Sequence, residues 1–334
     1  MSAARDHDQQ ARDQQDGLQD GAGPDGLEHL DPADAAAGER SVVLFGAPRR
    51  APPLAGGLFV VATPIGHLED VSLRALFTLA AADLIACEDT RVTRKLLARY
   101  GIARPLTAYH EHNAAQARPK ILARLAAGES VALVSDAGTP LVSDPGFRLV
   151  REAREAGFPV TAVPGPSAVL TALAVAGLPT DRFFFEGFLP ARGGPRRSRI
   201  AEIAAIPATL VLFETGPRLA EALADLAAGL GPREAAVCRE LTKLHEEVRR
   251  GDLAGLAKSY AEGAETRGEV VLVIGGPAAD APVSAEEIDR KLAAAMRTGS
   301  LKDAVAAVAA ATGEPRRTVY QRALALGRET SDEP

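Results

Sequence analysis

Three loops rich in Gly and Pro constrain the fold of this chain more than any other feature. Each loop follows a short apolar segment and precedes an amphipathic one: TPIGHLED at residues 63–70, SDAGTPLVSDPG at 135–146 and PGPSA at 164–168. Alternating strands and helices predict a parallel sheet, in which the carboxyl ends of the strands meet at one edge. Ligands of open α/β sheets bind at that edge, so we expect these loops to form a small-molecule site.

The alternating pattern predicts two α/β lobes, at residues 56–181 and 182–276. A small helical extension is expected at residues 283–328, because two helical segments joined by a short turn that contains Gly313 are typical of a helix-turn-helix. Neither lobe contains a GxGxxG fingerprint or a P-loop after its first strand. The sequence therefore disfavours the common dinucleotide-binding and mononucleotide-binding folds.

The start of the chain differs in composition from the rest. Residues 1–40 contain three Arg against ten Asp and Glu and no aromatic residue, while the remainder is almost neutral although the whole chain has a net charge of −6. So little apolar surface cannot offset the entropy of ordering a chain. We expect residues 1–55 to be a disordered acidic tail.

Cysteine content and hydropathy bear on the compartment. Cys87 and Cys238 are the only cysteines, which excludes a disulfide framework. No apolar run approaches the ~20 residues that span a bilayer, and the first residues do not resemble a signal peptide. We expect a cytoplasmic protein that does not contact a membrane.

Five short motifs resemble those of a known family. In chain order they are EDTR at residues 88–91, SDAGTP at 135–140, PGPSA at 164–168, EGFLP at 186–190 and RELTK at 239–243. Together they resemble the tetrapyrrole methylase superfamily of S-adenosylmethionine-dependent enzymes, and within it the ribosomal small subunit methyltransferase I family. The resemblance covers roughly residues 57–276, and several ordered motifs are more specific than any one of them.

The resemblance implies a two-lobed α/β fold with S-adenosylmethionine in the cleft between the lobes. It also implies a set of cofactor-binding residues, although Asp136 has the alternative role of a loop or helix cap. His67 departs from the family stretch, which usually reads TPIGN, and one imidazole nitrogen can replace the Asn only if a single hydrogen bond is needed. The expected cofactor residues are Pro64, His67, Asp89, Ser135, Asp136, Gly138, Thr139, Pro140, Ser167, Ala168, Phe213 and Gly268.

Four residues are candidates for catalysis of methyl transfer, which needs close alignment and a group that activates the nucleophile. Lys243 in RELTK can lose its proton if desolvated, or hold a phosphate, but it can also be a solvated ion pair with Glu240 or Glu246. His110 and His112 would share one face of a strand. Without a third ligand, we do not expect them to bind a metal. Glu214, after an apolar strand, is a further positioning candidate.

Basic residues predict RNA contacts in two places. A loop at residues 192–199 has four arginines between Gly and Pro, a composition that suits phosphate contacts but also fits a mobile solvated loop. The second helix of the helical extension carries further arginines, and a packing appendage is the alternative there. The expected RNA-binding residues are Arg192, Arg196, Arg197, Arg199, Arg316 and Arg317.

These observations lead to one principal hypothesis about function. The resemblance implies a homodimeric methyltransferase that modifies the 2′-oxygen of a cytidine ribose in 16S rRNA, as naked rRNA or within the assembled small ribosomal subunit. A tetrapyrrole C-methyltransferase on the same scaffold is the first alternative. A non-catalytic RNA-binding assembly factor is the second.

Overall fold

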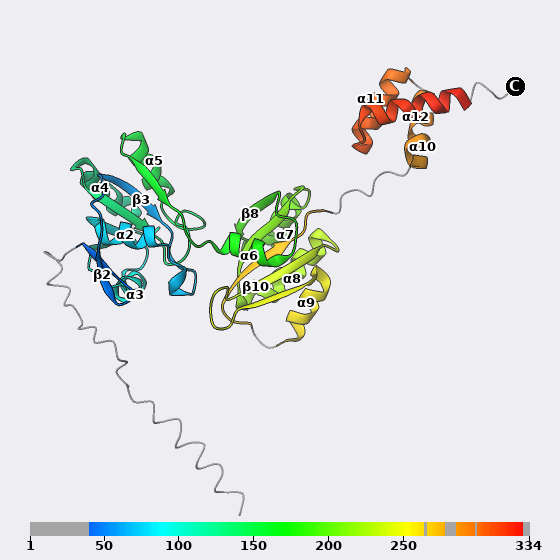
Figure 1. Cartoon of the computed structure of the whole chain (residues 1–334). Coiled ribbons are helices and arrows are strands. Elements are labelled where there is room, and N and C mark those ends of the chain that lie inside the picture. The colour runs from blue at the N-terminus through cyan, green and yellow to red at the C-terminus, as the bar shows by residue number, and fades with distance from the viewer. Residues whose placement is uncertain (1–39, 264–265, 278–284, 298, 330–334) are drawn as a thin grey trace, which may run out of the picture. The chain divides into compact units, whose positions relative to one another are not determined.

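The computed structural model describes residues 40–263, 266–277, 285–297 and 299–329. By their internal contacts, these residues form two compact units. Unit 1 contains residues 40–63, 71–136 and 145–164, and unit 2 contains residues 64–70, 137–144 and those from 165 onward. Figure 1 labels the elements of both units.

Unit 1 is built on a five-stranded, fully parallel sheet, as the alternating pattern predicts. Its strand order is β5-β4-β6-β3-β7, so the carboxyl ends of all five strands lie at one edge. The central strand β6 is buried at every position, as expected for a parallel sheet with both faces covered. The strands are β3 (Gly57–Val61), β4 (Leu84–Cys87), β5 (Leu106–Ala108), β6 (Ser130–Val134) and β7 (Val160–Val163).

Four helices cover the sheet of unit 1. Ala132 and Val134 of β6 pack with residues of α2 and α3, and because side chains alternate along a strand, Val131 and Leu133 point to the opposite face. The helix α4 packs against β6 and also contacts α5. The helices are α2 (Leu73–Ala81), α3 (Thr90–Arg99), α4 (Ala114–Ala126) and α5 (Phe147–Glu155).

A hairpin at the start of unit 1 corrects one expectation. The strands β1 (Ser41–Leu44) and β2 (Ala47–Arg50) pair in antiparallel fashion. Val42 is fully buried, and the Val43 N–H donates a hydrogen bond to Tyr100 O at 2.8 Å. Disorder over residues 1–55 is therefore wrong for residues 40–55, because the acidic composition ends at residue 40 and an apolar segment follows. Residues 1–39 lie outside the described residues.

Unit 2 contains a five-stranded mixed sheet with the order β11-β10-β12-β9-β8. The strands β8 and β9 are parallel, and the other pairs are antiparallel. One face packs on α7, α8 and α9, and the other packs on α6. The strands are β8 (Phe183–Phe188), β9 (Thr209–Thr215), β10 (Glu234–Arg239), β11 (Glu247–Asp252) and β12 (Glu269–Ile274). The helices are α6 (Ala168–Ala176), α7 (Gly193–Ile203), α8 (Gly216–Leu230) and α9 (Leu253–Glu262).

The boundary expected at residue 181 does not separate the two units. Helix α6 belongs to unit 2, because Ala172 and Leu173 pack on Val211, Val271 and other residues of that sheet. Residues 64–70 and 137–144 also belong to unit 2, although the strands that precede them are in unit 1. Sequence order alone places all three segments in the first lobe.

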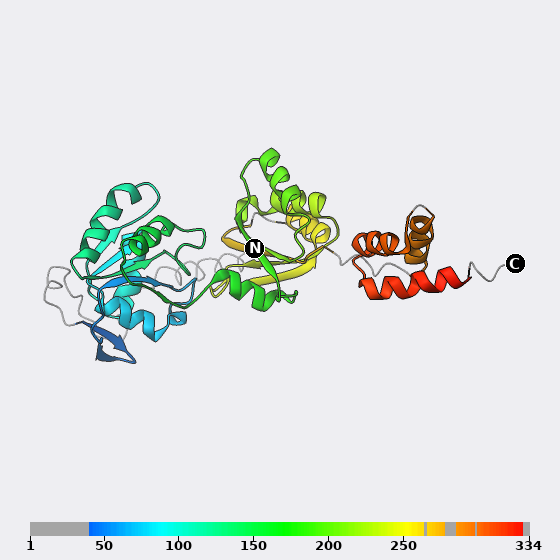
Figure 2. The same cartoon turned by 90° about the horizontal axis from the view of Figure 1, so that it is seen from above.

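Three helices follow residue 284 and form the expected helix-turn-helix-like arrangement, α10 (Ala285–Met296), α11 (Leu301–Thr312) and α12 (Arg316–Glu329). They pack around Leu292, Val308 and Val319, and both Figure 1 and Figure 2 show them side by side. Gly313 ends α11 in the left-handed conformation, as a C-terminal cap does. Within the described part of the chain, no helix is long and apolar enough to cross a membrane.

Candidate active site

The strand ends of unit 1 carry two carboxylates side by side. Asp89 follows β4 and caps α3, where its Oδ1 accepts a hydrogen bond from the Arg91 N–H at 2.8 Å. Asp136 follows β6, and its Oδ1 accepts from the Asp89 N–H at 3.0 Å. Ser135, which is buried, accepts through its carbonyl oxygen from Thr63 Oγ1 at 3.1 Å. These contacts fix the loop ends at the carboxyl edge of the sheet.

The two carboxylates have opposite pKa shifts. Hydrogen bonds from Arg91 lower the pKa of Asp89 to about 2, so this group is ionised at neutral pH. Burial raises the pKa of Asp136, and the Asp89 charge adds to the effect although the Asp89 N–H opposes it. A carboxylate that is poorly solvated at a strand end can bind a ligand that brings hydroxyl or ammonium donors.

In unit 2, the SDAGTP loop packs against the PGPSA segment. Thr139 Oγ1 donates a hydrogen bond to Pro166 O at 3.2 Å. Gly138 has φ of +75°, and a β-carbon there would lie 3.3 Å from Ile65 Cγ2. Gly138 and Pro140 are both buried. Only glycine combines this backbone conformation with so close an approach, as expected for a loop that surrounds a small molecule.

Helix α6 begins at the last residue of the PGPSA segment. Its first N–H groups can donate hydrogen bonds to a ligand. Ser167 is the N-cap, and its Oγ accepts from the Leu170 N–H at 3.5 Å. Ala168 begins the helix, where the first N–H groups have no partner within a helix. Phe213 on β9 packs edge-to-face against Phe185 and Phe188, at ring-centroid distances of 4.9 and 5.6 Å.

The TPIGH segment packs on the RELTK turn. The His67 N–H donates to Thr242 Oγ1 at 3.1 Å, and a β-carbon on Gly66 would lie 2.5 Å from Lys243 Cγ. His67 Nδ1 accepts from the Glu69 N–H at 3.3 Å, so one imidazole nitrogen makes a local hydrogen bond at a position that is usually Asn. Pro64 is buried, whereas His67 is exposed.

Lys243 is held between two carboxylates of unit 2. Its Nζ lies 2.9 Å from Glu240 Oε1 and 2.7 Å from Glu269 Oε2. Burial disfavours the ammonium form, but the hydrogen bonds to Glu269 and Glu240 outweigh it and raise the pKa of Lys243. This arrangement favours the ammonium form of Lys243, against the hypothesis that the lysine loses its proton. As a fixed cation, the lysine attracts an anion or an oxygen lone pair.

Glu214 does not share a face with Phe213. The two are neighbours on β9, so their side chains point to opposite sides of the sheet. Glu214 is 3% exposed, its Oε1 accepts from the Thr215 N–H at 2.8 Å, and Arg218 Nε lies 3.2 Å away. The structure corrects its expected positioning role in catalysis, because these contacts join β9 to α8 on the face that packs on α7, α8 and α9.

The HEHN segment forms a turn rather than a strand, which corrects the expected shared face of His110 and His112. The strand β5 ends at Ala108, and Asn113 closes the turn by accepting from the His110 N–H and donating to Ala108 O, both at 2.9 Å. The two imidazole rings are still near each other, with centroids 6.1 Å apart. His110 Nδ1 is buried and has no hydrogen-bond partner among the residues that the structure describes, whereas His112 is exposed.

The expected basic loop at residues 192–199 is largely helix α7, which corrects its assignment as an RNA-binding loop. Arg196 is 3% exposed and donates to Asp225 at 2.6 Å and to Glu221 at 3.2 Å. Arg199 pairs with Glu186 at 2.6 Å. These two arginines hold helices and strands of unit 2 together, so they are not available to phosphates. Arg192 precedes α7, and Arg197 is exposed with a 3.4 Å contact to Asp225.

The remaining predicted RNA contacts lie on α12. Arg316 and Arg317 are exposed at the start of this helix. Arg322, further along, instead donates to Asp289 of α10 and holds the helices together. Among the residues that the structure describes, no group of three His, Cys, Asp or Glu side chains is arranged to hold a metal ion.

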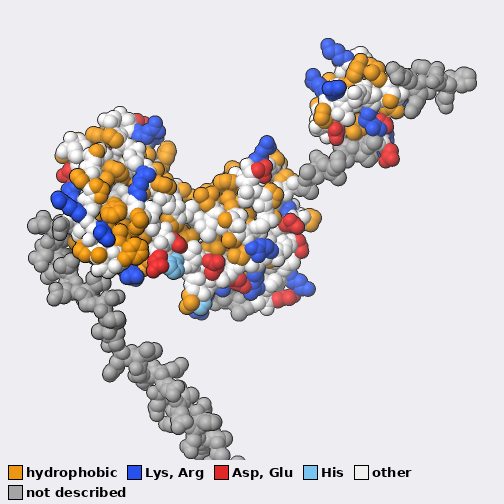
Figure 3. Space-filling view, viewed as in Figure 1, with side chains coloured by type: hydrophobic (Ala, Val, Ile, Leu, Met, Phe, Trp, Pro, Cys, Tyr) orange, Lys and Arg blue, Asp and Glu red, His pale blue; other side chains and the backbone are white. Residues whose placement is uncertain are grey.

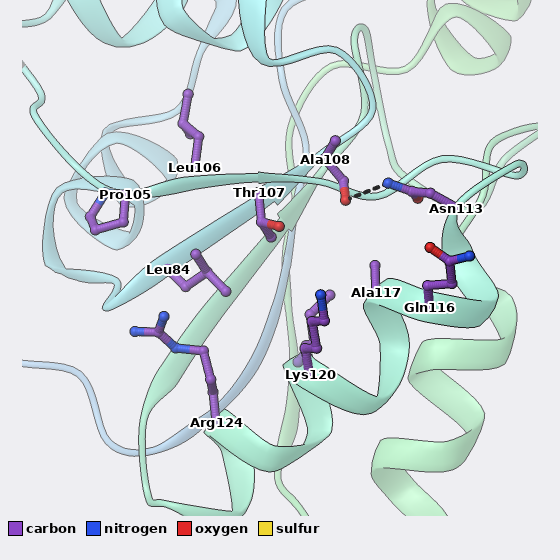
Figure 4. A pocket seen from close by; sticks show the side chains of 11 residues that line it. Leu84, Pro105, Leu106, Thr107, Ala108, Asn113, Gln116, Ala117, Lys120 and Arg124 are labelled. Carbon is purple, nitrogen blue, oxygen red and sulfur yellow. Dashed lines mark hydrogen bonds between the residues drawn. The ribbon is translucent and has the colours of Figure 1, made fainter.

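Unit 1 also contains a cavity that none of the predicted site residues lines. Its volume is about 490 Å³, and it lies between the edge strand β5 and helix α4. Figure 4 shows Lys120 of α4 extending toward Thr107 and Arg124 extending toward Leu84. Arg124 forms an ion pair with Glu129, so its charge is already partnered.

Sequence reasoning missed the residues that hold the candidate groups. Glu269 fixes Lys243 and Asp225 fixes Arg196, but these partners are 26 and 29 residues away in the sequence. No local pattern indicates such pairs. The spacing of Ile200 and Ile203, both buried, was the one signal that residues 193–203 form a helix.

Comparisons with known proteins identify the family. The model of the tetrapyrrole (corrin/porphyrin) methylases matches residues 57–257, and the model of the RsmI C-terminal HTH domain matches residues 282–327. Two solved structures resemble this chain in fold. The methyltransferase CobJ has a TM-score of 0.50 and 21% sequence identity, and the match covers 67% of this chain and 95% of that chain. Diphthine synthase has a TM-score of 0.50 and 18% sequence identity, and the match covers 65% of this chain and 89% of that chain.

Curated relatives are much more similar in sequence. A ribosomal RNA small subunit methyltransferase I from Mesorhizobium japonicum is 52% identical over 84% of this chain and 95% of the relative. One from Pseudomonas aeruginosa is 46% identical over 81% and 97%. With the strand-end loops and the helical extension both present, the chain belongs to the tetrapyrrole methylase family of S-adenosylmethionine-dependent enzymes and, within it, to the ribosomal RNA small subunit methyltransferase I group.

Proposed function

We propose that this protein is a cytoplasmic, homodimeric enzyme that methylates the 2′-oxygen of a cytidine ribose in 16S rRNA. The names of its relatives and the helical extension support an rRNA substrate. The observation that carries the chemistry is Lys243, a cation held by two carboxylates against the TPIGH segment. A tetrapyrrole C-methyltransferase and a non-catalytic assembly factor are the outcomes that the experiment below would reveal instead.

The described residues fit S-adenosylmethionine as a bound cofactor. Gly138 leaves room that a β-carbon would fill, and the first N–H groups of α6 at Ala168 can bind a carboxylate. Phe213 offers an aromatic edge, and Thr139 and Pro140 shape the loop beside it. In unit 1, Asp136 and Ser135 offer oxygen acceptors for hydroxyl and ammonium donors. The cofactor supplies an electrophilic methyl group on sulfur.

The residues of the chain then have to align and activate the ribose hydroxyl. In-line displacement depends mainly on positioning, so rigid loops contribute more than acid–base groups. We propose that Lys243 binds the phosphate beside the reacting ribose, or stabilises negative charge as the 2′-oxygen loses its proton. In unit 1, His110, whose Nδ1 has no hydrogen-bond partner among the described residues, is the alternative candidate for an acid–base role, with His112 beside it.

A methylation assay tests the proposal. Purified protein with labelled S-adenosylmethionine is offered assembled small subunits, naked 16S rRNA and a free tetrapyrrole, and the product nucleoside is identified by mass spectrometry. We expect 2′-O-methylcytidine from rRNA and no methylated tetrapyrrole. Base methylation would contradict the ribose assignment, tetrapyrrole methylation would contradict the substrate class, and RNA binding without any methyl transfer would indicate the assembly factor.

A further inference from the structure

The tip of the β1–β2 hairpin carries an aromatic side chain that the described chain does not cover. Phe45 is 100% exposed, and its φ of 53° lies in the left-handed region that a bulky residue rarely adopts. The stem of the hairpin is fixed by buried Val42 and by the hydrogen bond from Val43 to Tyr100. A single exposed apolar residue is common on proteins, so the inference depends on its surroundings.

Those surroundings are basic. Arg49 and Arg50 on β2 are exposed, and the bond from Val43 to Tyr100 joins the hairpin to the C-terminal end of α3. On α3, Arg94, Lys95 and Arg99 are exposed too. None of these five cations forms an ion pair with another residue of the described part of the chain. Figure 3 shows Lys and Arg side chains on the visible face of unit 1.

The fold itself does not account for this charge. Helix α3 contains no acidic residue, and Lys95 and Arg99 are spaced i,i+4, where like charges destabilise a helix. Arg99 lies in the last turn, where the helix dipole favours a cation, but Arg94 and Lys95 lie in the middle. Unpaired cations on one helix and the adjoining hairpin therefore indicate an anionic partner.

We propose that the surface of the β1–β2 hairpin and helix α3 that carries Phe45, Arg49, Arg50, Arg94, Lys95 and Arg99, the hairpin–α3 surface, binds a single-stranded segment of the substrate rRNA. Phe45 stacks on an unpaired base, and the cations contact the phosphates on either side of it. Stacking on an aromatic side chain beside a basic surface is how proteins hold single-stranded RNA. A second copy of this chain fits less well, because the same surface would face it with the same sign of charge. The inference rests on rRNA being the substrate.

Two variants separate stacking from charge. Phe45→Ser removes the ring from a fully exposed position, so folding is unaffected, and we expect the affinity for a single-stranded fragment of small-subunit rRNA to fall by about 5-fold to 100-fold. The slope of log affinity against log salt should not change. Arg50→Ser combined with Lys95→Ser should instead reduce that slope by about 1.4, because two phosphate contacts are lost.

A control variant removes two positive charges from a different part of unit 1. Arg148→Ser combined with Arg154→Ser removes two exposed cations of α5, a helix that also carries Glu152 and Glu155. This variant should keep the wild-type affinity and slope. Equal loss in both double variants would mean that only net charge matters and would overturn the proposal. So would dissociation of a dimer by Phe45→Ser, measured by light scattering, with RNA affinity unchanged.

The proposal can fail without the proposed function failing. Normal RNA affinity in all variants, with 2′-O-methylcytidine still formed by the wild type, would refute the hairpin–α3 surface alone. Weaker RNA binding in the variants, with a wild type that forms no 2′-O-methylcytidine, would refute the proposed reaction alone. Binding of S-adenosylmethionine, measured by calorimetry, should be the same in every variant.

Discussion

Gly268 leaves the space that the Glu240 side chain occupies: a β-carbon on Gly268 would lie 2.6 Å from Glu240 Oε1. That oxygen accepts from Lys243 Nζ and from the Glu269 N–H, each at 2.9 Å. Gly268 also has φ of +94°, which favours glycine. Expected from the family resemblance to bind the cofactor, Gly268 thus has a steric role in holding the carboxylate that fixes Lys243.

Gly268→Ala should therefore slow methyl transfer by displacing Glu240. We expect a lower single-turnover rate on saturated enzyme, together with a lower Tm because of backbone strain. Glu240→Gln is the matched control, since it weakens the ion pair without adding volume or strain. If both variants lose rate and only Gly268→Ala loses Tm, the steric role is supported. A loss of cofactor affinity alone in Gly268→Ala would favour direct binding.

Lys243→Met should keep RNA and cofactor bound but slow the chemical step by ~10²-fold, the size of effect of losing one positioned group. Lys243→Arg, which keeps the charge, should retain more of the rate. Because the pKa of Lys243 is raised, its cation persists at neutral pH, and its stabilising ion pairs are lost only as the pH rises through that raised pKa, above the ordinary value for lysine. A rate limb near pH 7 that disappears in Lys243→Met would contradict this. A slow His110→Ala beside a normal Lys243→Met would transfer the role to the histidine.

Gly138→Ala should reduce affinity for S-adenosylmethionine, because its new β-carbon would approach Ile65 and fill space in the loop. Gly128→Ala is a suitable control: Gly128 has φ of +82°, but a β-carbon there would meet no atom within 4 Å. Both variants have similar backbone strain, so the difference between them isolates the loop contact. Calorimetry on folded protein gives the affinity, and equal affinities would argue against the loop as a cofactor site.

Arg196→Met should destabilise unit 2 by about 3 kcal/mol, because it leaves the Asp225 carboxylate with only the 3.4 Å contact from the exposed Arg197. Arg196 is 3% exposed, and Asp225 is largely buried beside it. Arg197→Ser, one residue along the helix and exposed, should change stability little. Urea unfolding measures both. RNA affinity that falls in Arg196→Met without loss of stability would restore its predicted role as a phosphate contact.

Asp136→Asn should raise the Tm at neutral pH and weaken cofactor binding. Because the pKa of Asp136 is raised, the protonated form is favoured in the folded state, and that stability is lost as the pH rises through the raised pKa. An amide cannot ionise, yet its oxygen can still accept from the Asp89 N–H. The gain in Tm should decline as the pH falls through the raised pKa and should be absent at and below the ordinary pKa of an Asp side chain. A lower Tm at pH 7 would show instead that the carboxylate stabilises the fold.

The sequence was most informative where burial and turn chemistry act locally. The strand β6 and the loop after it could be predicted, because a short apolar segment precedes a run of Ser, Asp, Gly and Pro. The parallel direction of the strands in the first sheet could be predicted from the alternation of strands and helices. Ser167 likewise occupies the N-cap position that its place before an apolar helix indicates. Such features depend on neighbours within a few residues, so a single sequence contains them.

The sequence was least informative where side chains pair over long separations. Arg196 was predicted to contact RNA, because nothing near it in the sequence indicates its partner Asp225, 29 residues away. Gly193, Gly194 and Pro195 suggested a loop, yet Pro is accepted in the first turn of a helix. The sequence allows both the charged and the neutral form of Lys243, and the nearby carboxylate of Glu269 in the folded chain favours the charged form. Burial and charge neutralisation are properties of the folded chain. The roles of these residues therefore cannot be predicted from their neighbours in the sequence.

The division of residues 64–70 and 137–144 from the strands that precede them affects how the protein can be cut and assembled. The described chain passes from one unit to the other at residues 63/64, 70/71, 136/137, 144/145 and 164/165. A fragment that starts at residue 165 would lack both segments, and with them the hydrogen bonds from His67 to Thr242 and from Thr139 to Pro166. Unit 2 therefore cannot be expressed with all its native contacts as one continuous fragment of the chain. During synthesis, its contacts cannot all form until most of the sequence of unit 1 has been made.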